Sequence, residues 1–239
     1  MTKAKDEDGT FDRKQADRSV ENLLAEYFEI RDLNDAKQYI EELSAPTEIY
    51  HPILVHSIVS AGTRKLTLIE LAASLLVKIQ KDDILSSANL LSGLLSFCDT
   101  IEEESSEFPN LPKFTGQLVG FIIRDGVLEL KDLLFLQKVK FSNPKCLVPI
   151  KFYGSALDTV FKQVESEEEV ELRLSQAGLS LSLLSCGLSI TADMLPRFIE
   201  VRFSFLFLSF SPKGRRMRQC KRHCENNHLF IGGAEDLHP

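Results

Sequence analysis

The sequence predicts an all-α fold in which residues 19–139 form a solenoid-like stack of helical hairpins. Two observations support this prediction. Apolar residues in this range recur three and four positions apart, which places them on one face of a helix. No proline stands between Ile53 and Phe108, and the apolar stretches end at glycine, proline or aspartate. Because the range shows no convincing strand-like alternation, we expect short turns to join the helices in pairs.

Five helices are expected before residue 100, each with an apolar stripe along one face. Asp32 is the predicted N-cap of the second helix, because its carboxylate can accept hydrogen bonds from the free amides of the first turn. Pro52 should stand in the first turn of the third helix, where a missing N–H is tolerated, and Gly62 should end that helix. The expected spans are 19–28, 33–43, 52–62, 67–80 and 82–99, the last of them opened by Asp82 and Asp83.

A polar stretch, residues 99–107, separates the fifth helix from the sixth, and Phe108-Pro109 ends it. Four glutamates crowd this stretch, so we expect a solvated acidic loop whose carboxylates could receive arginine side chains of a partner. The sixth helix should follow Pro112 and close at Asp125-Gly126, and a seventh should cover residues 129–138.

Gly116 and Gly120 stand four positions apart in the sixth helix. No membrane span surrounds them, so we interpret the pair as a place where another helix of the core packs closely. The apolar stripes also predict which side chains are buried, namely those of Leu24, Phe28, Ile40, Leu75, Leu91 and Ile122.

The flanking regions differ from the helical part in composition. The N-terminal residues carry many charges and almost no apolar side chains, which is typical of disorder. The C-terminal end combines the apolar run FSFLFLSF with a basic stretch and a polar end, and should be a disordered tail. The predicted organisation is a disordered segment at 1–18, the helical domain at 19–139, a helical extension at 140–200 and a basic tail at 201–239.

Within the extension, Pro144 and Pro149 suggest a linker. A helix is expected over Ser155–Val164. Ser166 and Glu169 form a predicted capping box, in which the serine side chain and the glutamate satisfy free amides at a helix start.

Composition restricts the class of protein. The chain has 239 residues and is 44% hydrophobic, which is typical of an ordinary globular protein. Its formal net charge of -7 argues against nucleic-acid binding by the whole protein, which needs a basic surface. Its five cysteines have no framework spacing, which favours a reduced compartment, and we expect the cytoplasm. The longest apolar run has eight residues, whereas a membrane span needs about 20, so we expect a soluble protein with no membrane partner.

No pattern in the sequence indicates catalysis. Nucleophile, metal-hydrolase and phosphate-binding motifs are absent, so we expect neither an enzyme, nor a cofactor, nor a small-molecule substrate. His51 and His56 are five residues apart, about 140° around a helix, and therefore do not share a face. The C-terminal group of Cys220, His223, Cys224 and His228 is too compressed for two separated ligand pairs, and we expect no metal site.

Charge divides the chain into two parts. Residues 19–139 hold 19 acidic and 10 basic residues, a net charge of -9, so a charged partner of this domain should be basic. Residues 140–239 carry a net charge of +2. An alternative function is therefore RNA binding by the tail, whose candidate contacts are Lys213, Arg215, Arg216, Arg218, Lys221 and Arg222.

Three motifs resemble one known family, the MA3 domain. LLAEYFEIRDLNDAKQYIEEL (Leu23–Leu43) is similar to the opening of that domain, whose pattern D-x-x-E-A-x-x-x-[IV]-x-E-L is matched with Asp35 in place of the usual glutamate. YHPILVHSIVSAG (Tyr50–Gly62) resembles its third helix, and its HP pair is similar to plant members. A D-x-x-x-D-x-P pattern of the family is matched by Glu103, Glu107 and Pro109, with glutamate at both acidic positions.

The resemblance covers about half the chain and implies a fold, a role and a site. MA3 domains occur in the eukaryotic translation initiation factor 4 gamma scaffolds and in programmed cell death protein 4, and are armadillo- or HEAT-like helical stacks. The implied role is that of a translation-initiation adaptor that docks the DEAD-box RNA helicase of initiation, with mRNA or a ribosome-associated initiation complex as further partners. An inhibitory relative that blocks the helicase is the alternative. The implied contact residues are Glu103, Glu107, Phe108 and Pro109.

Overall fold

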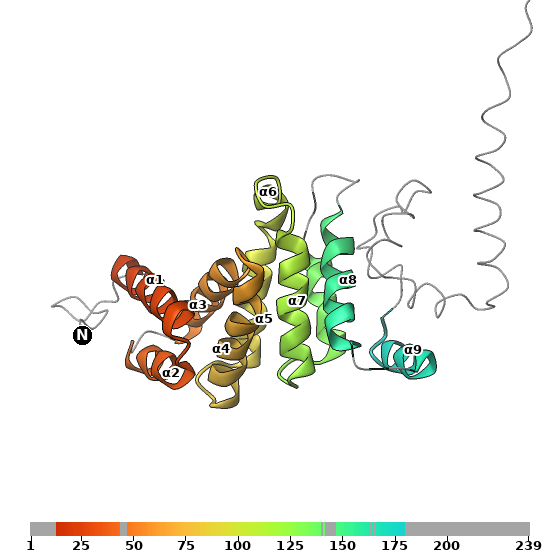
Figure 1. Cartoon of the computed structure of the whole chain (residues 1–239), viewed down its shortest axis with the longest axis horizontal. Helices are drawn as coiled ribbons and strands as arrows, with labels where there is room; N and C mark the ends of the chain where they lie inside the picture. The colour runs from red at the N-terminus through yellow and green to blue at the C-terminus, as the bar shows by residue number, and fades with distance from the viewer. Residues whose placement is uncertain are drawn as a thin grey trace, which may run out of the picture.

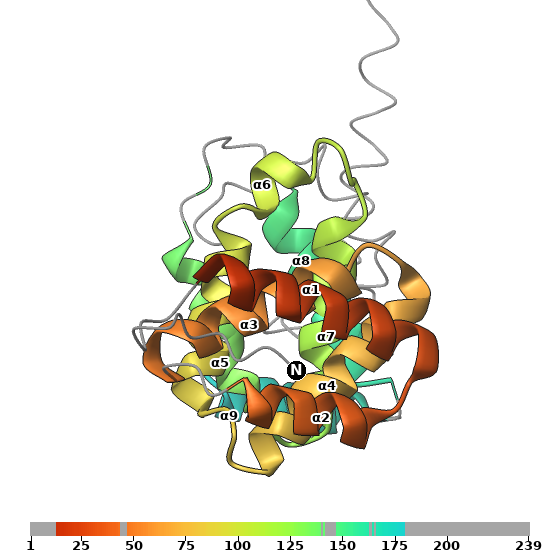
Figure 2. The same cartoon turned by 90° about the vertical axis from the view of Figure 1, so that its left-hand side faces the viewer.

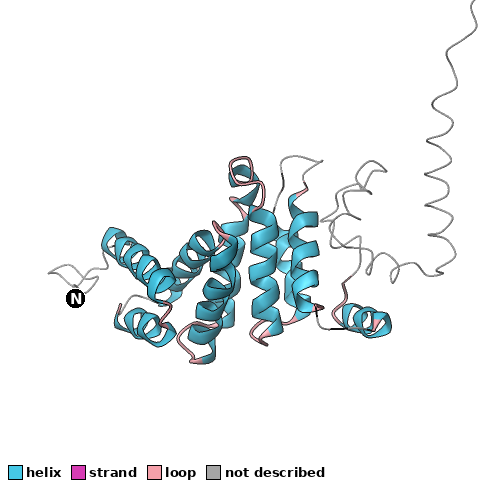
Figure 3. Ribbon diagram, viewed as in Figure 1, coloured by secondary structure: helices cyan, strands magenta, loops and turns pink. Residues whose placement is uncertain are grey.

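The computed structural model of the chain describes residues 13–43, 47–139, 141, 147–162, 164 and 166–179. Every regular element in these ranges is a helix (Figure 3), so the predicted fold class is confirmed. The elements in chain order are α1 (Arg13–Ile30), α2 (Leu33–Glu42), α3 (Thr47–Gly62), the 3₁₀ helix η1 (Leu66–Leu68), α4 (Ile69–Lys81), α5 (Ser87–Cys98), α6 (Ile101–Glu104), α7 (Leu111–Arg124), the 3₁₀ helix η2 (Leu130–Lys138), α8 (Val148–Val160) and α9 (Glu167–Gln176).

The helices stack side by side along the long axis of the molecule (Figure 1). One row of contacts runs from α1 through α3 and α5 to η2, and a second runs from α2 through α4 and α7 to α8. Contacts of α1 with α2 and of α3 with α4 join the rows. Viewed from the end of the stack, α1 and α2 form its outer face (Figure 2). This arrangement of paired, stacked helices is the HEAT-like architecture expected from the sequence.

A single apolar core runs through the stack. Side chains that are fully buried, such as Leu54, Leu75 and Leu118, come from successive helices and pack into one continuous cluster. Burying one such side chain stabilises the fold by about 1.5–3 kcal/mol. Four of the six predicted core residues are buried, but Phe28 and Leu91 are only partly buried and lie at the edge of the cluster.

Two helix starts differ from the prediction for the same reason. Helix α1 begins at Arg13, so residues 13–18 of the segment expected to be disordered are helical. Ala16 lies one turn before Val20 on the buried face and is 0% exposed, which ties this charged turn to the core. Helix α3 begins before Pro52, which lies inside it. The free energy gained by burying Tyr50 ahead of the proline offsets the loss of the one backbone hydrogen bond that Pro52 cannot donate.

The fifth helix starts later than expected. Asp83 has a φ of 59°, in the left-handed region, so the chain turns at the point where the aspartates were expected to open a helix. The N-cap of α5 is instead Ser86, whose side chain accepts a hydrogen bond of 3.1 Å from the amide of Asn89. The predicted cap of α2 is confirmed, because the Asp32 carboxylate accepts from the amides of Asn34 and Asp35.

Helix α8 extends the stack beyond residue 139. It begins at Val148 rather than Ser155, because Pro149 stands in its first turn and does not act as a linker. Phe152 and Tyr153 are fully buried. A Cβ added to Gly116 of α7 would clash with the carbonyl oxygen of Phe152, and one added to Gly120 would lie 2.7 Å from that of Ala156. The interpretation of the glycine pair as a close helix contact is confirmed.

Two smaller elements also differ from expectation. The acidic stretch is not all loop, since it contains the single helical turn α6, which Ile101 anchors with a side chain that is 0% exposed. The seventh predicted helix is the 3₁₀ helix η2, not an α-helix. Ser166 caps α9 through the amide of Glu169 as predicted, but its hydroxyl also donates to Glu168, and Glu169 pairs with Arg173.

Candidate protein-docking site

The sequence-predicted contact residues lie together on one projection of the molecule. We call residues 101–109 the acidic loop; it comprises α6 and the turn that leads to α7 (Figure 1). The loop projects from one side of the stack, near the middle of its long axis, between α5 and α7, with helices on both sides. Glu103, Glu107, Phe108 and Pro109 are all exposed on it. A projecting loop on a helical frame can present side chains to a partner without disturbing the core.

Backbone hydrogen bonds give the acidic loop a defined shape. The amide of Ser106 donates to the carbonyl oxygen of Glu103 over 3.2 Å, and the Ser106 hydroxyl donates to the same oxygen over 2.7 Å. The amide of Phe108 donates to the carbonyl oxygen of Glu104 over 2.9 Å. These bonds form a tight turn after α6; Glu103 belongs to α6 itself, and Glu107 lies in the turn.

The Glu104 carboxylate is bound within the protein by two side chains. One oxygen lies 2.8 Å from a guanidinium nitrogen of Arg64, which belongs to the turn between α3 and η1. The other oxygen accepts a hydrogen bond of 2.9 Å from the hydroxyl of Thr100. The Glu104 side chain is 26% exposed. Of the acidic residues in the loop, Glu103 and Glu107 are therefore the exposed pair.

Phe108 adds an apolar surface beside the two exposed carboxylates. It is 41% exposed, one of few large apolar side chains in the described part of the chain with that much contact with water. The guanidinium of Arg64 lies over its ring, 4.3 Å from the centroid, in a cation–π contact. Aromatic side chains with an open face are frequent anchors of protein interfaces.

A second basic residue holds the far end of the loop. The ammonium group of Lys151, on α8, donates a hydrogen bond of 3.1 Å to the carbonyl oxygen of Pro109. The sequence analysis missed both Arg64 and Lys151. They stand about 40 residues away from the loop on either side, and no local pattern indicates such distant pairs.

The two histidines of α3 are both affected by burial. Burial lowers the pKa of His56 below its ordinary value, and the nearby Glu104 carboxylate opposes this change. Its Nδ1 lies 3.3 Å from the hydroxyl of Ser96, and its ring packs edge-on against that of Phe97. Burial also lowers the pKa of His51. Both histidines thus have the structural surroundings expected of packing residues.

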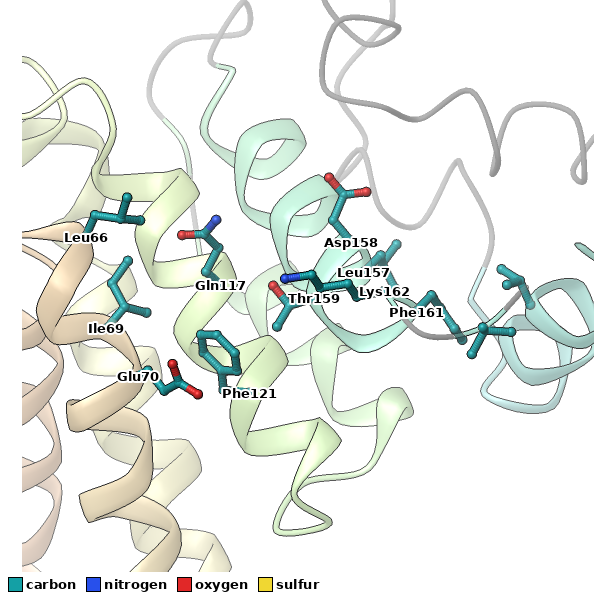
Figure 4. Close-up of a pocket in the computed structure, with 12 residues that line it drawn as sticks. Leu66, Ile69, Glu70, Gln117, Phe121, Leu157, Asp158, Thr159, Phe161 and Lys162 are labelled. Carbon is teal, nitrogen blue, oxygen red and sulfur yellow. The ribbon is translucent and has the colours of Figure 1, made fainter. Parts of the chain in front are cut away.

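A separate groove of about 590 Å³ lies between α4, α7, α8 and α9 (Figure 4). Phe121, Leu157 and Phe161 supply much of its apolar wall, and Glu70, Asp158 and Lys162 stand among its polar lining. None of the described residues that line it is a histidine or a cysteine. Nothing in this lining selects an occupant, and the groove plays no part in the function proposed below.

Other candidate features are absent from, or lie outside, the described part of the chain. Among the described residues, no group of three or more His, Cys, Asp or Glu side chains could hold a metal ion. No described helix combines the length and apolar character needed to cross a membrane. The six candidate nucleic-acid contacts of the tail, Lys213, Arg215, Arg216, Arg218, Lys221 and Arg222, lie outside the described residues, as do Cys220, His223, Cys224 and His228.

Comparison with known proteins adds a family match. The family model of the MA3 domain matches residues 16–129, a range that includes the acidic loop and Arg64 but not α8. The chain is 27% identical over 171 residues, 67% of its length, to eukaryotic translation initiation factor 4G of Arabidopsis thaliana. It is 28% identical to the same factor of Triticum aestivum and 25% identical to that of Oryza sativa, over 61% and 62% of its length. The matched part is a tenth or less of each relative, 8–10% of its length.

Proposed function

We propose that this chain is a translation-initiation adaptor of the cytoplasm, which binds the DEAD-box RNA helicase of the initiation machinery through its acidic loop. The match of residues 16–129 to the MA3 domain model supports this proposal. The similarity to plant initiation factor 4G supports a role in initiation. Other members of an initiation complex, including mRNA, would then meet the chain through that assembly.

The observation that carries the proposal is the exposed pair of carboxylates beside an open aromatic ring. Glu103 and Glu107 are exposed on a turn with a defined backbone, and Phe108 stands next to Glu107. A partner surface that carries arginine or lysine around an apolar pocket would match this arrangement. Carboxylates accept two parallel hydrogen bonds from an arginine, which gives such a contact direction as well as attraction.

The proposal predicts that reversing the two charges abolishes docking. In the full chain carrying Glu103→Lys and Glu107→Lys, like charges would face the basic surface of the helicase, and affinity should fall by at least about tenfold. The fold should persist, because solvated surface charges contribute little to stability. Affinity for the purified helicase, measured by calorimetry, and the melting temperature together test this expectation.

The matched control carries Glu21→Lys and Glu29→Lys on α1. Both residues are exposed, and the change in net charge is the same, but α1 lies away from the acidic loop at the end of the stack. This control should keep nearly the wild-type affinity. Wild-type binding should also weaken with added salt, because charges separated by more than about 8 Å are screened at physiological ionic strength. Equal affinities of the wild type and the loop variant would refute the proposed site.

A further inference from the structure

We infer that Arg64 is a positioning residue of the docking site, which holds the acidic loop so that Glu103 and Glu107, and not Glu104, meet the partner. The inference rests on the function proposed above and assigns a role to a residue outside the loop. It concerns a partner surface that offers basic groups to these two carboxylates and an apolar site to the Phe108 ring.

The first argument is that one guanidinium makes two different contacts with the loop. Arg64 pairs with the Glu104 carboxylate at 2.8 Å and stacks on the Phe108 ring at 4.3 Å. Glu104 ends the helical turn α6, and Phe108 ends the turn that follows it. The two contacts therefore fix both ends of the segment that carries Glu107, because a planar guanidinium can pair at its edge and stack with its face.

The second argument is that Arg64 itself is anchored to the core. It follows Thr63, which is 2% exposed and comes directly after the last residue of α3. The amide of Thr63 donates to the carbonyl oxygen of Val59 over 3.0 Å, and its hydroxyl donates to the same oxygen over 2.7 Å. The residue that holds the loop is thus attached to a rigid helix end.

The third argument separates positioning from simple electrostatics. Removing Arg64 makes the loop more negative by one charge, so a purely electrostatic role predicts that a basic partner binds an Arg64→Ala variant more tightly. A positioning role predicts the opposite, since the partner must then order a loop that was previously held in place. The sign of the change in affinity therefore distinguishes the two roles.

The structure offers a closely matched control in Arg124. Its guanidinium lies 4.7 Å from the centroid of the Phe121 ring and 3.2 Å from the Asp125 carboxylate. Its side chain is 39% exposed, against 35% for Arg64. It stands at the C-terminal end of α7, while the acidic loop joins the N-terminal end of that helix, about 20 Å away along 14 residues. Arg124→Ala removes the same two kinds of contact far from the loop.

The experiment compares the wild type, Arg64→Ala, Arg64→Lys and Arg124→Ala as full chains. Amide hydrogen exchange of the free proteins reports on the loop, and calorimetry reports affinity for the purified helicase. In Arg64→Ala, the amides of Ser106, Glu107 and Phe108 should exchange faster, the melting temperature should hardly change, and affinity should fall about tenfold. Arg64→Lys should recover part of that loss, because an ammonium group can still pair with Glu104. Arg124→Ala should match the wild type in loop exchange and in affinity.

Two results would overturn the inference. Unchanged loop exchange in Arg64→Ala would show that Arg64 does not hold the loop, and unchanged or tighter helicase binding would show that holding it does not assist docking. If the wild type itself fails to bind the helicase, the proposed function is wrong and the docking role of Arg64 with it. The exchange measurement would still decide whether Arg64 orders the loop, so the two failures remain distinguishable.

Discussion

At the residue scale, Asp82 shows how a single carboxylate can join two helices. It caps the C-terminal end of α4, and its Oδ2 lies 2.8 Å from the ammonium group of Lys37 on α2 and 3.1 Å from that of Lys78 on α4. Hydrogen bonds from Lys37 and Lys78 lower the pKa of Asp82 below its ordinary value of 3.8. The ionised form is therefore favoured more in the folded than in the unfolded chain.

This lowered pKa predicts a pH-dependent contribution to stability. The pKa of Asp82 is lower in the folded chain than in the unfolded chain. The stability that the ionised Asp82 contributes is therefore fully present above pH 3.8 and is lost as the pH falls through the folded pKa. Asp82→Asn should lower the free energy of unfolding at neutral pH, and the difference from the wild type should shrink toward pH 2. Urea unfolding of both proteins at several pH values measures this difference. A difference that stays constant into strong acid would mean that the ion pairs are not its source.

At the element scale, the contact of α7 with α8 depends on the absence of a side chain at Gly116. A Cβ there would meet the backbone carbonyl of Phe152, which cannot rotate away as a side chain could. We expect Gly116→Ala to destabilise the fold by about 1–3 kcal/mol, despite the better helix propensity of alanine. Chemical unfolding measures the change. Lys113→Ala, at an exposed position of the same helix, is the control, and an equal loss of stability there would contradict the packing argument.

The existence of the longer helices was predictable from the sequence, whereas the helical turn α6 and several helix ends were not. Spacing reveals an apolar face, and the glycine pair of α7 indicates a close contact, because both signals are local. The true start of α3 depends on burial of Tyr50 ahead of Pro52, and the start of α5 depends on the left-handed backbone of Asp83. Tertiary packing decides such positions, and no short window of sequence contains it.

The site shows the same division between local and distant information. The carboxylates of Glu103 and Glu107 could be identified from a run of glutamates and a family pattern, both of which are contiguous in sequence. The pairing of Glu104 within the protein could not be identified in this way, because its partner Arg64 comes from a different turn, 40 positions earlier. Which members of an acidic run remain available to a partner is a property of the folded chain.

At the scale of the whole molecule, the folded unit extends past the MA3 match at residue 129. Helix α8 buries Phe152 and Tyr153, and Lys151 on the same helix binds the acidic loop. A fragment of residues 13–139 should therefore expose the apolar face of α7 and aggregate or melt at low temperature, whereas residues 13–179 should fold. Circular dichroism and size-exclusion chromatography of the two fragments test this. A stable, monomeric fragment of residues 13–139 would show that α8 is dispensable.

In a stack of helices whose contacts are mainly between neighbours, parts of the stack can unfold separately from the rest. The terminal pair α1 and α2 has neighbours on one side only, so it can fray independently at a lower free energy than the interior of the stack. The acidic loop joins α5 and α7, which have neighbours on both sides. Thermal fluctuations that transiently detach the first two helices would thus leave the loop in its native shape.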